Sequence, residues 1–211
     1  MASAPTFDHE RPLWEQGLRF VAGVDEVGRG PLAGPVVAGA VILPSGARFP
    51  WLGEVRDSKD LPAAKREELA EKIRAQAVAF GLGAVEPERI DAMGIAPASR
   101  LAMARALAAL QPAAEYALID AFRLPEVVIP HHGIIDGDAL SLSIAAASIV
   151  AKVHRDRIMQ MYDALYPDYG FGRHKGYPTS AHMEALTRHG PCPIHRRSFG
   201  PVRYCLVRGR A

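Results

Sequence analysis

Cysteine and long hydrophobic runs are the two features that this 211-residue sequence has least of. Its two cysteines, Cys192 and Cys205, have neither the spacing of metal ligands nor the number that a disulfide framework needs, which indicates a reducing compartment. A membrane-spanning helix needs about 18 consecutive apolar residues, whereas the apolar stretch 144–151 includes Ser148 and is stopped by Lys152. The N-terminus has no basic start followed by an apolar block, as a secretory signal would. We therefore expect a cytoplasmic protein with no membrane partner.

The composition predicts one globular domain. Hydrophobic residues make up 49% of the chain and charged residues 23%, and neither an internal repeat nor a low-complexity linker divides it. We expect residues 1–18 to form a loose N-terminal arm, residues 19–205 a single domain, and residues 206–211 a short tail. No large apolar stripe is left over for a partner subunit, so a monomer is the expectation.

Charge is distributed unevenly along the chain. Residues 171–211 contain eight basic residues and one acidic residue, a net charge of +7, which leaves −5 for residues 1–170. A basic face opposite an acidic one suits a protein that holds a polyanion against a carboxylate centre. A solvated basic surface with no ligand explains the same charges equally well.

Strand-like and helix-like segments alternate along the sequence. Strands are predicted at residues 19–25, 35–43, 79–85, 116–120 and 133–136. Helices are predicted at residues 62–77, 99–110 and 140–165, followed by a short helix between a Thr179 cap and Gly190. The early strands are close enough in sequence to pair as an antiparallel hairpin or meander. The expected fold is therefore α/β, a mixed sheet flanked by helices, with a helical C-terminal part.

Four acidic residues lie where predicted strands end. Asp25 and Glu26 end the first strand, Asp120 ends another, and Asp138 follows the next, just before the long helix. Ligands bind at strand ends in open α/β sheets, and clustered carboxylates select hard cations such as Mg²⁺ or Mn²⁺. Two such ions can activate a water and stabilise the leaving oxygen of a phosphodiester. Any one of these residues taken alone is better explained as a turn or cap, but all four together favour a metal site. Neighbours on a strand point to opposite faces, so Asp25 and Glu26 can share that site only if the strand twists or ends there.

The glycine-rich segment after the first strand fits no nucleotide-binding motif. Its glycines, at positions 28, 30 and 34, lack the G-x-G-x-x-G spacing, Pro31 interrupts them, and a strand follows instead of a helix. This argues against a nucleotide-dependent metabolic enzyme. Gly28 and Gly30 would let the backbone approach a sugar-phosphate closely, and Arg29 offers a charged fork to a phosphate. A plain turn with an exposed arginine is the alternative.

Several of these segments together resemble a known family. The DE-x-GRG segment at residues 25–30, DSK at 57–59, AAS-x-x-AK at 146–152 and HKGYPT at 174–179 occur in the order found in bacterial ribonuclease HII. With the segments between them, the similarity covers roughly residues 20–202. It implies a ribonuclease H-like fold, cleavage of the RNA strand of RNA–DNA hybrids, and nicking on the 5′ side of single ribonucleotides in duplex DNA. The products would carry a 3′-hydroxyl and a 5′-phosphate.

The same resemblance implies roles for individual residues. Asp25, Glu26, Asp120 and Asp138 would form the catalytic centre and bind two Mn²⁺ or Mg²⁺ ions. Gly28, Arg29 and Gly30 would recognise the 2′-hydroxyl, the group that separates RNA from DNA. Tyr177 would stack on the deoxyribose after the ribonucleotide. Without the resemblance, the sequence favours a packing or turn role for this residue. The residues implied to contact the nucleic-acid backbone are Lys59, Ser148 and Lys152.

The sequence departs from the family pattern around the last carboxylate. The segment IIDGD replaces the commoner K-G-D, which leaves Asp136 as an extra acid two residues before Asp138. We assign the catalytic role to Asp138, because it aligns with the segment that runs into SIAAAS. Ribonuclease HIII is less similar, since its loop lacks GRG.

A non-catalytic nucleic-acid-binding module is the alternative interpretation of the sequence. Such a module would bind through the basic C-terminal third, in a salt-sensitive way and without metal-dependent cleavage. It leaves four acidic residues near a phosphate backbone without a role.

Overall fold

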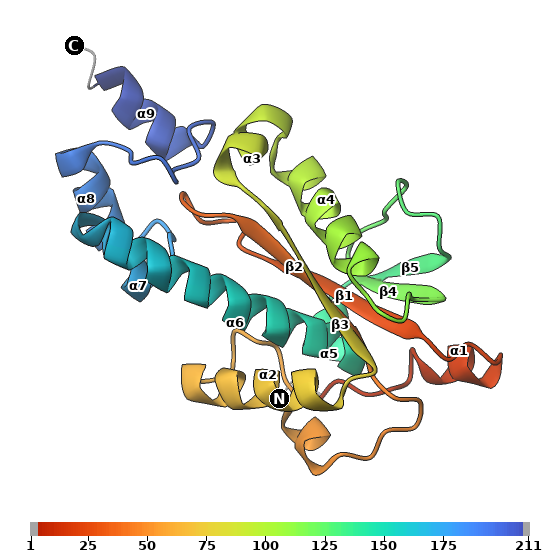
Figure 1. Ribbon diagram of the computed structural model, residues 1–211. Helices are drawn as coiled ribbons and strands as arrows, with labels where there is room; N and C mark the ends of the chain where they lie inside the picture. Colours follow the sequence, from red (N-terminus) through yellow and green to blue (C-terminus); the bar gives the residue numbers. More distant parts are fainter. Residues whose placement is uncertain (1–3, 209–211) are drawn as a thin grey trace.

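The computed structural model describes residues 4–208, so residues 1–3 of the expected arm and 209–211 of the expected tail lie outside the described residues. A five-stranded sheet in the order β3-β2-β1-β4-β5 forms the centre of the molecule (Figure 1). The strands are β1 (Val21–Val27), β2 (Val36–Ile42), β3 (Ala79–Val85), β4 (Tyr116–Asp120) and β5 (His131–Ile134). β1, β2 and β3 pair antiparallel, whereas β4 runs parallel to both β1 and β5. The predicted mixed sheet with an early antiparallel meander is confirmed.

Helices follow and precede the strands much as the sequence predicted. The α-helices are α1 (Arg11–Glu15), α2 (Ala63–Gln76), α3 (Pro87–Met93), α4 (Ile95–Ala108), α5 (Gly137–Leu140), α6 (Leu142–Leu165), α7 (Phe171–His174), α8 (Ser180–His189) and α9 (Gly200–Arg208). Two 3₁₀ helices occupy Pro50–Glu54 and Pro167–Tyr169. The predicted cap of α8 is confirmed, because the Thr179 side chain accepts a hydrogen bond from the backbone of His182.

Two local predictions need correction. α4 begins four residues earlier than predicted, and α3, which precedes it, was not predicted at all. The sequence features that mark the ends of α3 are Pro87 in its first turn and Gly94 after its last residue. The last strand was predicted at 133–136 but occupies His131–Ile134, because Asp136 adopts a left-handed conformation (φ 54°) that turns the chain out of the sheet. His131 in β5 is half-buried and accepts a hydrogen bond from the backbone of Leu124.

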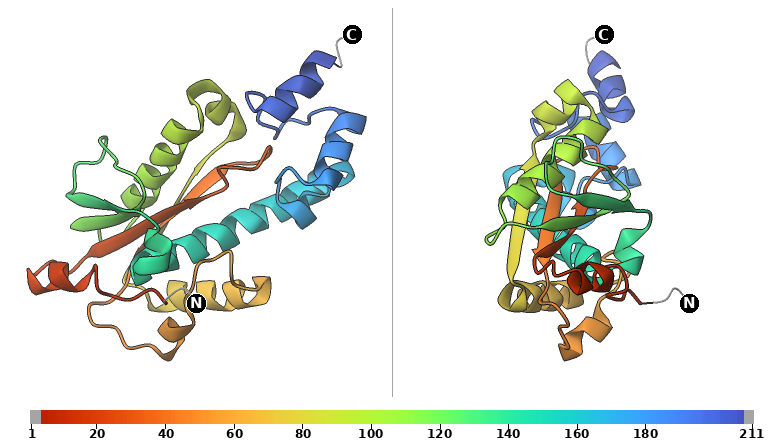
Figure 2. Two further views of the ribbon diagram at one scale, coloured as in Figure 1. Left: turned by 180° about the vertical axis from the view of Figure 1, so that it is seen from behind. Right: turned by 90° about the vertical axis from the view of Figure 1, so that its right-hand side faces the viewer.

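The sheet lies between two long helices, α4 on one face and α6 on the other (Figure 1; Figure 2). Ala22 and Val24 of β1 pack with Met103 and Ala106 of α4 in one buried cluster. β2 is buried along its whole length, which explains its continuous apolar sequence. The C-terminal helices α7, α8 and α9 gather at the far end of α6 (Figure 2). Within residues 4–208, no helix is both long enough and apolar enough to span a membrane.

The face of β1 that carries Asp25 lies against the backbone of α6. Successive residues alternate between the two faces of a strand, so Asp25 shares its face with Gly23. A Cβ on Gly23 would lie 2.0 Å from the carbonyl carbon of Ser143 in α6, which no side chain can tolerate. Glycine at this position therefore lets the start of α6 approach the sheet and sets the depth at which Asp25 lies.

The N-terminal segment is not loose where the structure describes it. Glu10 is fully buried, and its Oε1 atom accepts hydrogen bonds from Ser141 Oγ (2.7 Å) and from the backbone N–H of Ser143 (3.0 Å). Ser141 is also the N-cap of α6. A carboxylate at a helix N-terminus is favoured by the helix dipole. Glu10 therefore anchors residues 4–18 to the helix that borders Asp25.

We predict that Glu10→Ala lowers the free energy of unfolding by about 2–4 kcal/mol, because two buried hydrogen bonds to a charged acceptor are lost. Urea unfolding followed by circular dichroism measures this change. Glu15→Ala is the matched control, since Glu15 is exposed on α1. Equal stabilities of the two variants would show that Glu10 is not an anchor.

Candidate active site

The carboxylates of Asp25 and Asp120 meet because of how β1 and β4 pair. The parallel pairing of these strands ends at Val24 and Ile119, so Asp25 and Asp120 are the next residues on each strand and lie side by side. β1 continues against β2 as far as Val27. Beyond Val24, therefore, β1 is flanked on one side only. Glu26 points to the opposite face by alternation, and its carboxylate can reach the other two at this open edge.

Asp25, Glu26 and Asp120 form a compact acidic group. One carboxylate oxygen from each residue lies within 4.8 Å of the others. Burial raises the pKa of Asp25 well above its ordinary value, and the charges of Glu26 and Asp120 raise it further. Burial likewise raises the pKa of Glu26 to about 7, opposed by the Arg29 guanidinium. Three carboxylates this close repel one another unless a cation neutralises them.

The oxygen atoms of this group fit a divalent cation. Glu26 Oε2 is buried and has no hydrogen-bond partner among the described residues, which is costly for a carboxylate oxygen unless it binds a cation. Oxygen-only ligands are those that Mg²⁺ and Mn²⁺ prefer. The acidic group is therefore a candidate divalent-metal site.

Asp138 lies beside this group but outside it. It is largely buried at the start of α5, and burial raises its pKa. Its Oδ2 atom is 3.6 Å from Lys59 Nζ, which is also 3.5 Å from Asp57 Oδ2. The backbone N–H of Gly137 donates to Asp120 Oδ1 (2.7 Å), so α5 is tied directly to the acidic group. Asp136 is exposed.

One cavity of about 230 Å³ is lined by every residue that the sequence analysis assigned to the site. Its lining also includes Val27 and Ser58, but not Asp136. The predicted site residues in its wall are Asp25, Glu26, Gly28, Arg29, Gly30, Lys59, Asp120, Asp138, Ser148, Lys152 and Tyr177. Residues more than 150 positions apart thus share one surface, as expected from the carboxylate positions.

Ser148 lies deep in the wall of this cavity. It is only 3% exposed, and its hydroxyl lies 2.9 Å from Ser58 Oγ. Its hydroxyl also hydrogen-bonds to Asp25 and thereby lowers the pKa of that residue, against the larger effect of burial. Ser148 therefore lines the cavity and is also placed to orient Asp25.

The start of the glycine loop (residues 28–35) forms one wall of the cavity. The structure requires glycine at position 28 more strongly than at position 30. Gly28 has a φ of +93°, and a Cβ there would lie 2.2 Å from Arg155 Nε. Gly30 has no such constraint, because its Cβ would meet only Tyr177 Cε1, at 3.8 Å. The fold itself therefore explains glycine at 28, whereas at 30 the missing side chain leaves open space toward the cavity. The Arg29 guanidinium lies over the Phe122 ring and 3.4 Å from Glu26 Oε1.

Tyr177 is held in place by a buried chain of neutral histidines. The backbone N–H of Cys192 donates to His195 Nδ1 (3.0 Å), which leaves His195 Nε2–H to donate to His182 Nε2 (3.0 Å). His182 Nδ1–H then donates to the carbonyl of Tyr177 (2.9 Å). Burial lowers the pKa of His195 to about 4, so this chain carries no charge at neutral pH. His174 is buried and stacks on His182.

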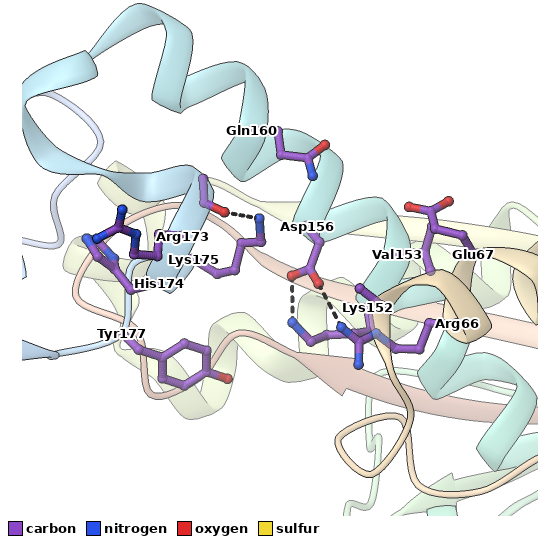
Figure 3. Close-up of a pocket in the computed structure, with 12 residues that line it drawn as sticks. Arg66, Glu67, Lys152, Val153, Asp156, Gln160, Arg173, His174, Lys175 and Tyr177 are labelled. Atoms are coloured by element: carbon purple, nitrogen blue, oxygen red, sulfur yellow. Dashed lines mark hydrogen bonds and ion pairs between the residues drawn. The ribbon is translucent and has the colours of Figure 1, made fainter.

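A second hollow of about 480 Å³ adjoins the cavity and shares Lys152 and Tyr177 with it (Figure 3). Asp156 lies between two of its cations, with Oδ1 2.6 Å from Lys152 Nζ and Oδ2 3.6 Å from Arg66 Nη2 (Figure 3). Arg173 and Lys175 bring two charges of the basic C-terminal segment to the same wall. The sequence analysis did not identify Arg66 or Asp156. The only sequence feature that could have pointed to them is that each places a charge on an otherwise apolar helix face.

Comparison with known proteins agrees with this geometry. The family model described as Ribonuclease HII matches residues 22–202. Ribonuclease HII of Dehalococcoides mccartyi is 50% identical over 202 residues, which is 96% of each chain. That of Desulfitobacterium hafniense is 54% identical over 197 residues, 93% of this chain and 75% of the relative. The crystal structure of ribonuclease H2 from Pyrococcus horikoshii superposes with a TM-score of 0.76 at 28% identity, covering 90% of this chain and 98% of that one.

The fold and the acidic residues identify the class of protein, and the sequence comparisons identify the family. The mixed five-stranded sheet is a ribonuclease H-like fold, and its acidic residues at the ends of neighbouring strands form a candidate divalent-metal site. The family model spans most of the sheet and all four acidic positions. The chain belongs to the ribonuclease HII family.

We predict that Gly28→Ala lowers the melting temperature by roughly 5 °C or more, because it combines a left-handed backbone with a clash against Arg155. Gly30→Ala, the matched control, changes the melting temperature by less than about 2 °C. Differential scanning calorimetry of both variants tests this, and equal losses would refute the distinction.

We also predict that the affinity for Mg²⁺ or Mn²⁺ increases with pH. Below a pKa of about 7, Glu26 holds a proton that a cation must displace. Affinity then falls by up to tenfold for each pH unit below about 7. Isothermal titration calorimetry at about pH 6, 7 and 8, in two buffers of different ionisation enthalpy, measures affinity and proton release together. Glu26→Gln should release fewer protons, and a pH-independent affinity would contradict the prediction.

Proposed function

We propose that this protein is an endoribonuclease that cuts the RNA strand of RNA–DNA hybrids. It also nicks duplex DNA on the 5′ side of single embedded ribonucleotides and leaves a 3′-hydroxyl and a 5′-phosphate. The observation that carries the proposal is the single cavity in which the acidic group faces the glycine loop. Membership of the ribonuclease HII family supports the choice of substrate.

The acidic residues divide the work between them. Asp25, Glu26 and Asp120 hold the metal, and Asp138 completes the negative wall as the fourth carboxylate. Two bound Mn²⁺ or Mg²⁺ ions would activate a water and stabilise the leaving oxygen of the phosphodiester. Ser148 holds Asp25 in position, and the N–H of Gly137 holds Asp120.

The loop and Tyr177 supply the selection for a ribonucleotide. Gly28, Arg29 and Gly30 contact the 2′-hydroxyl and the flanking phosphates, chiefly through the backbone, and the bare surface at Gly30 leaves room for the sugar. Tyr177, which is 40% exposed beside Gly30 in the cavity wall, stacks on the following deoxyribose. Lys59 and Lys152 contact the nucleic-acid backbone.

A binding module without catalysis fits these observations less well. Buried carboxylates facing a phosphodiester repel it unless a cation lies between them, so such a module would weaken its own binding. Action as a monomer in the cytoplasm stays a prediction.

The decisive experiment uses an end-labelled DNA duplex that contains one ribonucleotide. We expect one nick 5′ to the ribonucleotide with Mn²⁺ or Mg²⁺, none with chelator, and none in an all-DNA duplex. Asp25→Asn and Asp138→Asn should each lower the rate by roughly a hundredfold or more, because charge that stabilises the transition state is lost.

Asp136→Asn is the matched control. It removes the same charge two residues before Asp138, but Asp136 does not line the cavity. It should cut at the parental rate. Salt-sensitive binding with no metal-dependent nick in the parent protein would reject the nuclease and favour the binding module.

A further inference from the structure

Two buried arginines lie behind the glycine loop. Arg155 comes from α6 and Arg196 from the segment before α9, and both are fully buried. Neither belongs to the cavity wall. Together they are the largest side chains that the described part of the protein buries completely.

Arg196 binds three carbonyl groups of the loop at once. Its Nη2 donates to Gly28 O (2.6 Å), its Nη1 to Arg29 O (2.9 Å) and its Nε to Gly34 O (2.9 Å). The two ends of the loop are therefore joined through one guanidinium. The planar fork of arginine suits this arrangement, which a single ammonium group could not reproduce.

Arg155 binds the second half of the loop in the same manner. Its Nη2 donates to Ala33 O (3.1 Å) and its Nε to Pro35 O (3.0 Å). Its Nη1 donates to Lys175 O (3.0 Å), two residues before Tyr177. This arginine thus connects the glycine loop to the segment that carries Tyr177, which lies beside the loop in the cavity wall.

Carbonyl oxygens accept the hydrogen bonds of both guanidinium groups, and the Arg196 guanidinium also lies 5.2 Å over the Phe199 ring. Within residues 4–208, no carboxylate forms an ion pair with either arginine. Burial lowers the pKa of Arg155 to about 10, and burial together with the charge of Arg155 lowers that of Arg196 to about 9. Burying charges without a carboxylate partner is expensive, and a hydrophobic core would have filled this space at lower cost.

The direction of these carbonyls determines the direction of the neighbouring N–H groups. In a trans peptide, the C=O of one residue and the N–H of the next point to opposite sides. With Gly28 O and Arg29 O turned inward to Arg196, the N–H groups of Arg29 and Gly30 are turned away from Arg196. Among the described residues, neither N–H donates a backbone hydrogen bond. These are the donors that a hydroxyl or phosphate oxygen in the cavity would use.

We propose that Arg155 and Arg196 are positioning residues for ribonucleotide selection, which hold the glycine loop with its free N–H groups presented to the cavity. They touch no substrate themselves and act through Gly28, Arg29 and the segment before Tyr177. The inference rests on the proposed function, since it assigns the selection for a 2′-hydroxyl to this loop.

The test compares two binding constants in a protein that cannot cut. In an Asp25→Asn background with Mg²⁺, fluorescence anisotropy measures Kd for a duplex with one ribonucleotide and for the same duplex in all-DNA form. Arg196→Lys and Arg155→Lys keep the charge but lose the fork. We expect the ratio of the two Kd values to fall by about tenfold or more in each, while binding of the all-DNA duplex changes little. Measuring both duplexes with one preparation cancels any loss of folded protein.

Arg157→Lys and Arg197→Lys are the matched controls, because both arginines are exposed and lie two residues and one residue from the buried pair. Each should keep the parental ratio. Parental ratios in both buried variants would overturn the proposal, and so would variants with no folded fraction to titrate, because the arginines would then serve the fold alone. If the Asp25→Asn parent itself shows no preference for the ribonucleotide, it is the proposed function that fails.

Discussion

The parallel pairing of β1 with β4 is the constraint on which the site depends. It places Asp25 beside Asp120, and because it stops at Val24 and Ile119, the open edge of β1 admits Glu26 as well. The same edge faces the turn after β5, where Gly137 binds Asp120 and Asp138 follows. A shift of one residue in this register would move Asp25 to the other face of the sheet and separate the acidic group.

Around this edge the protein holds charge of both signs at a cost to stability. Three carboxylates lie together with raised pKa values, and one buried oxygen has no partner among the described residues. Behind the glycine loop lie two guanidiniums whose pKa values are lowered. Other parts of the protein offset this loss of stability, namely the sheet buried between α4 and α6 and the Glu10 anchor. Such local strain within a well-packed frame is typical of a functional site.

The sequence predicted elements best where apolar patterning was strong. β2 and β3 were found almost to the residue, because a buried strand leaves a continuous or alternating apolar run. α3 and α1 were missed, since each is short and buries few side chains. The N-terminal arm was expected to be loose because the anchor, Glu10, reads as a surface residue until its serine partners 131 and 133 positions away are known.

The sequence alone determined the chemistry of this protein: four acids at strand ends, a glycine loop between two strands, and the family that these segments resemble. Only the tertiary structure decided which groups act together. It separated Asp138 from the three clustered carboxylates, turned Ser148 inward to Asp25, and showed that Arg155 and Arg196 support the loop from behind. The reason is physical. Residue type sets what a group can bind, but burial, orientation and long-range partners arise only when distant segments pack, and no local pattern records them.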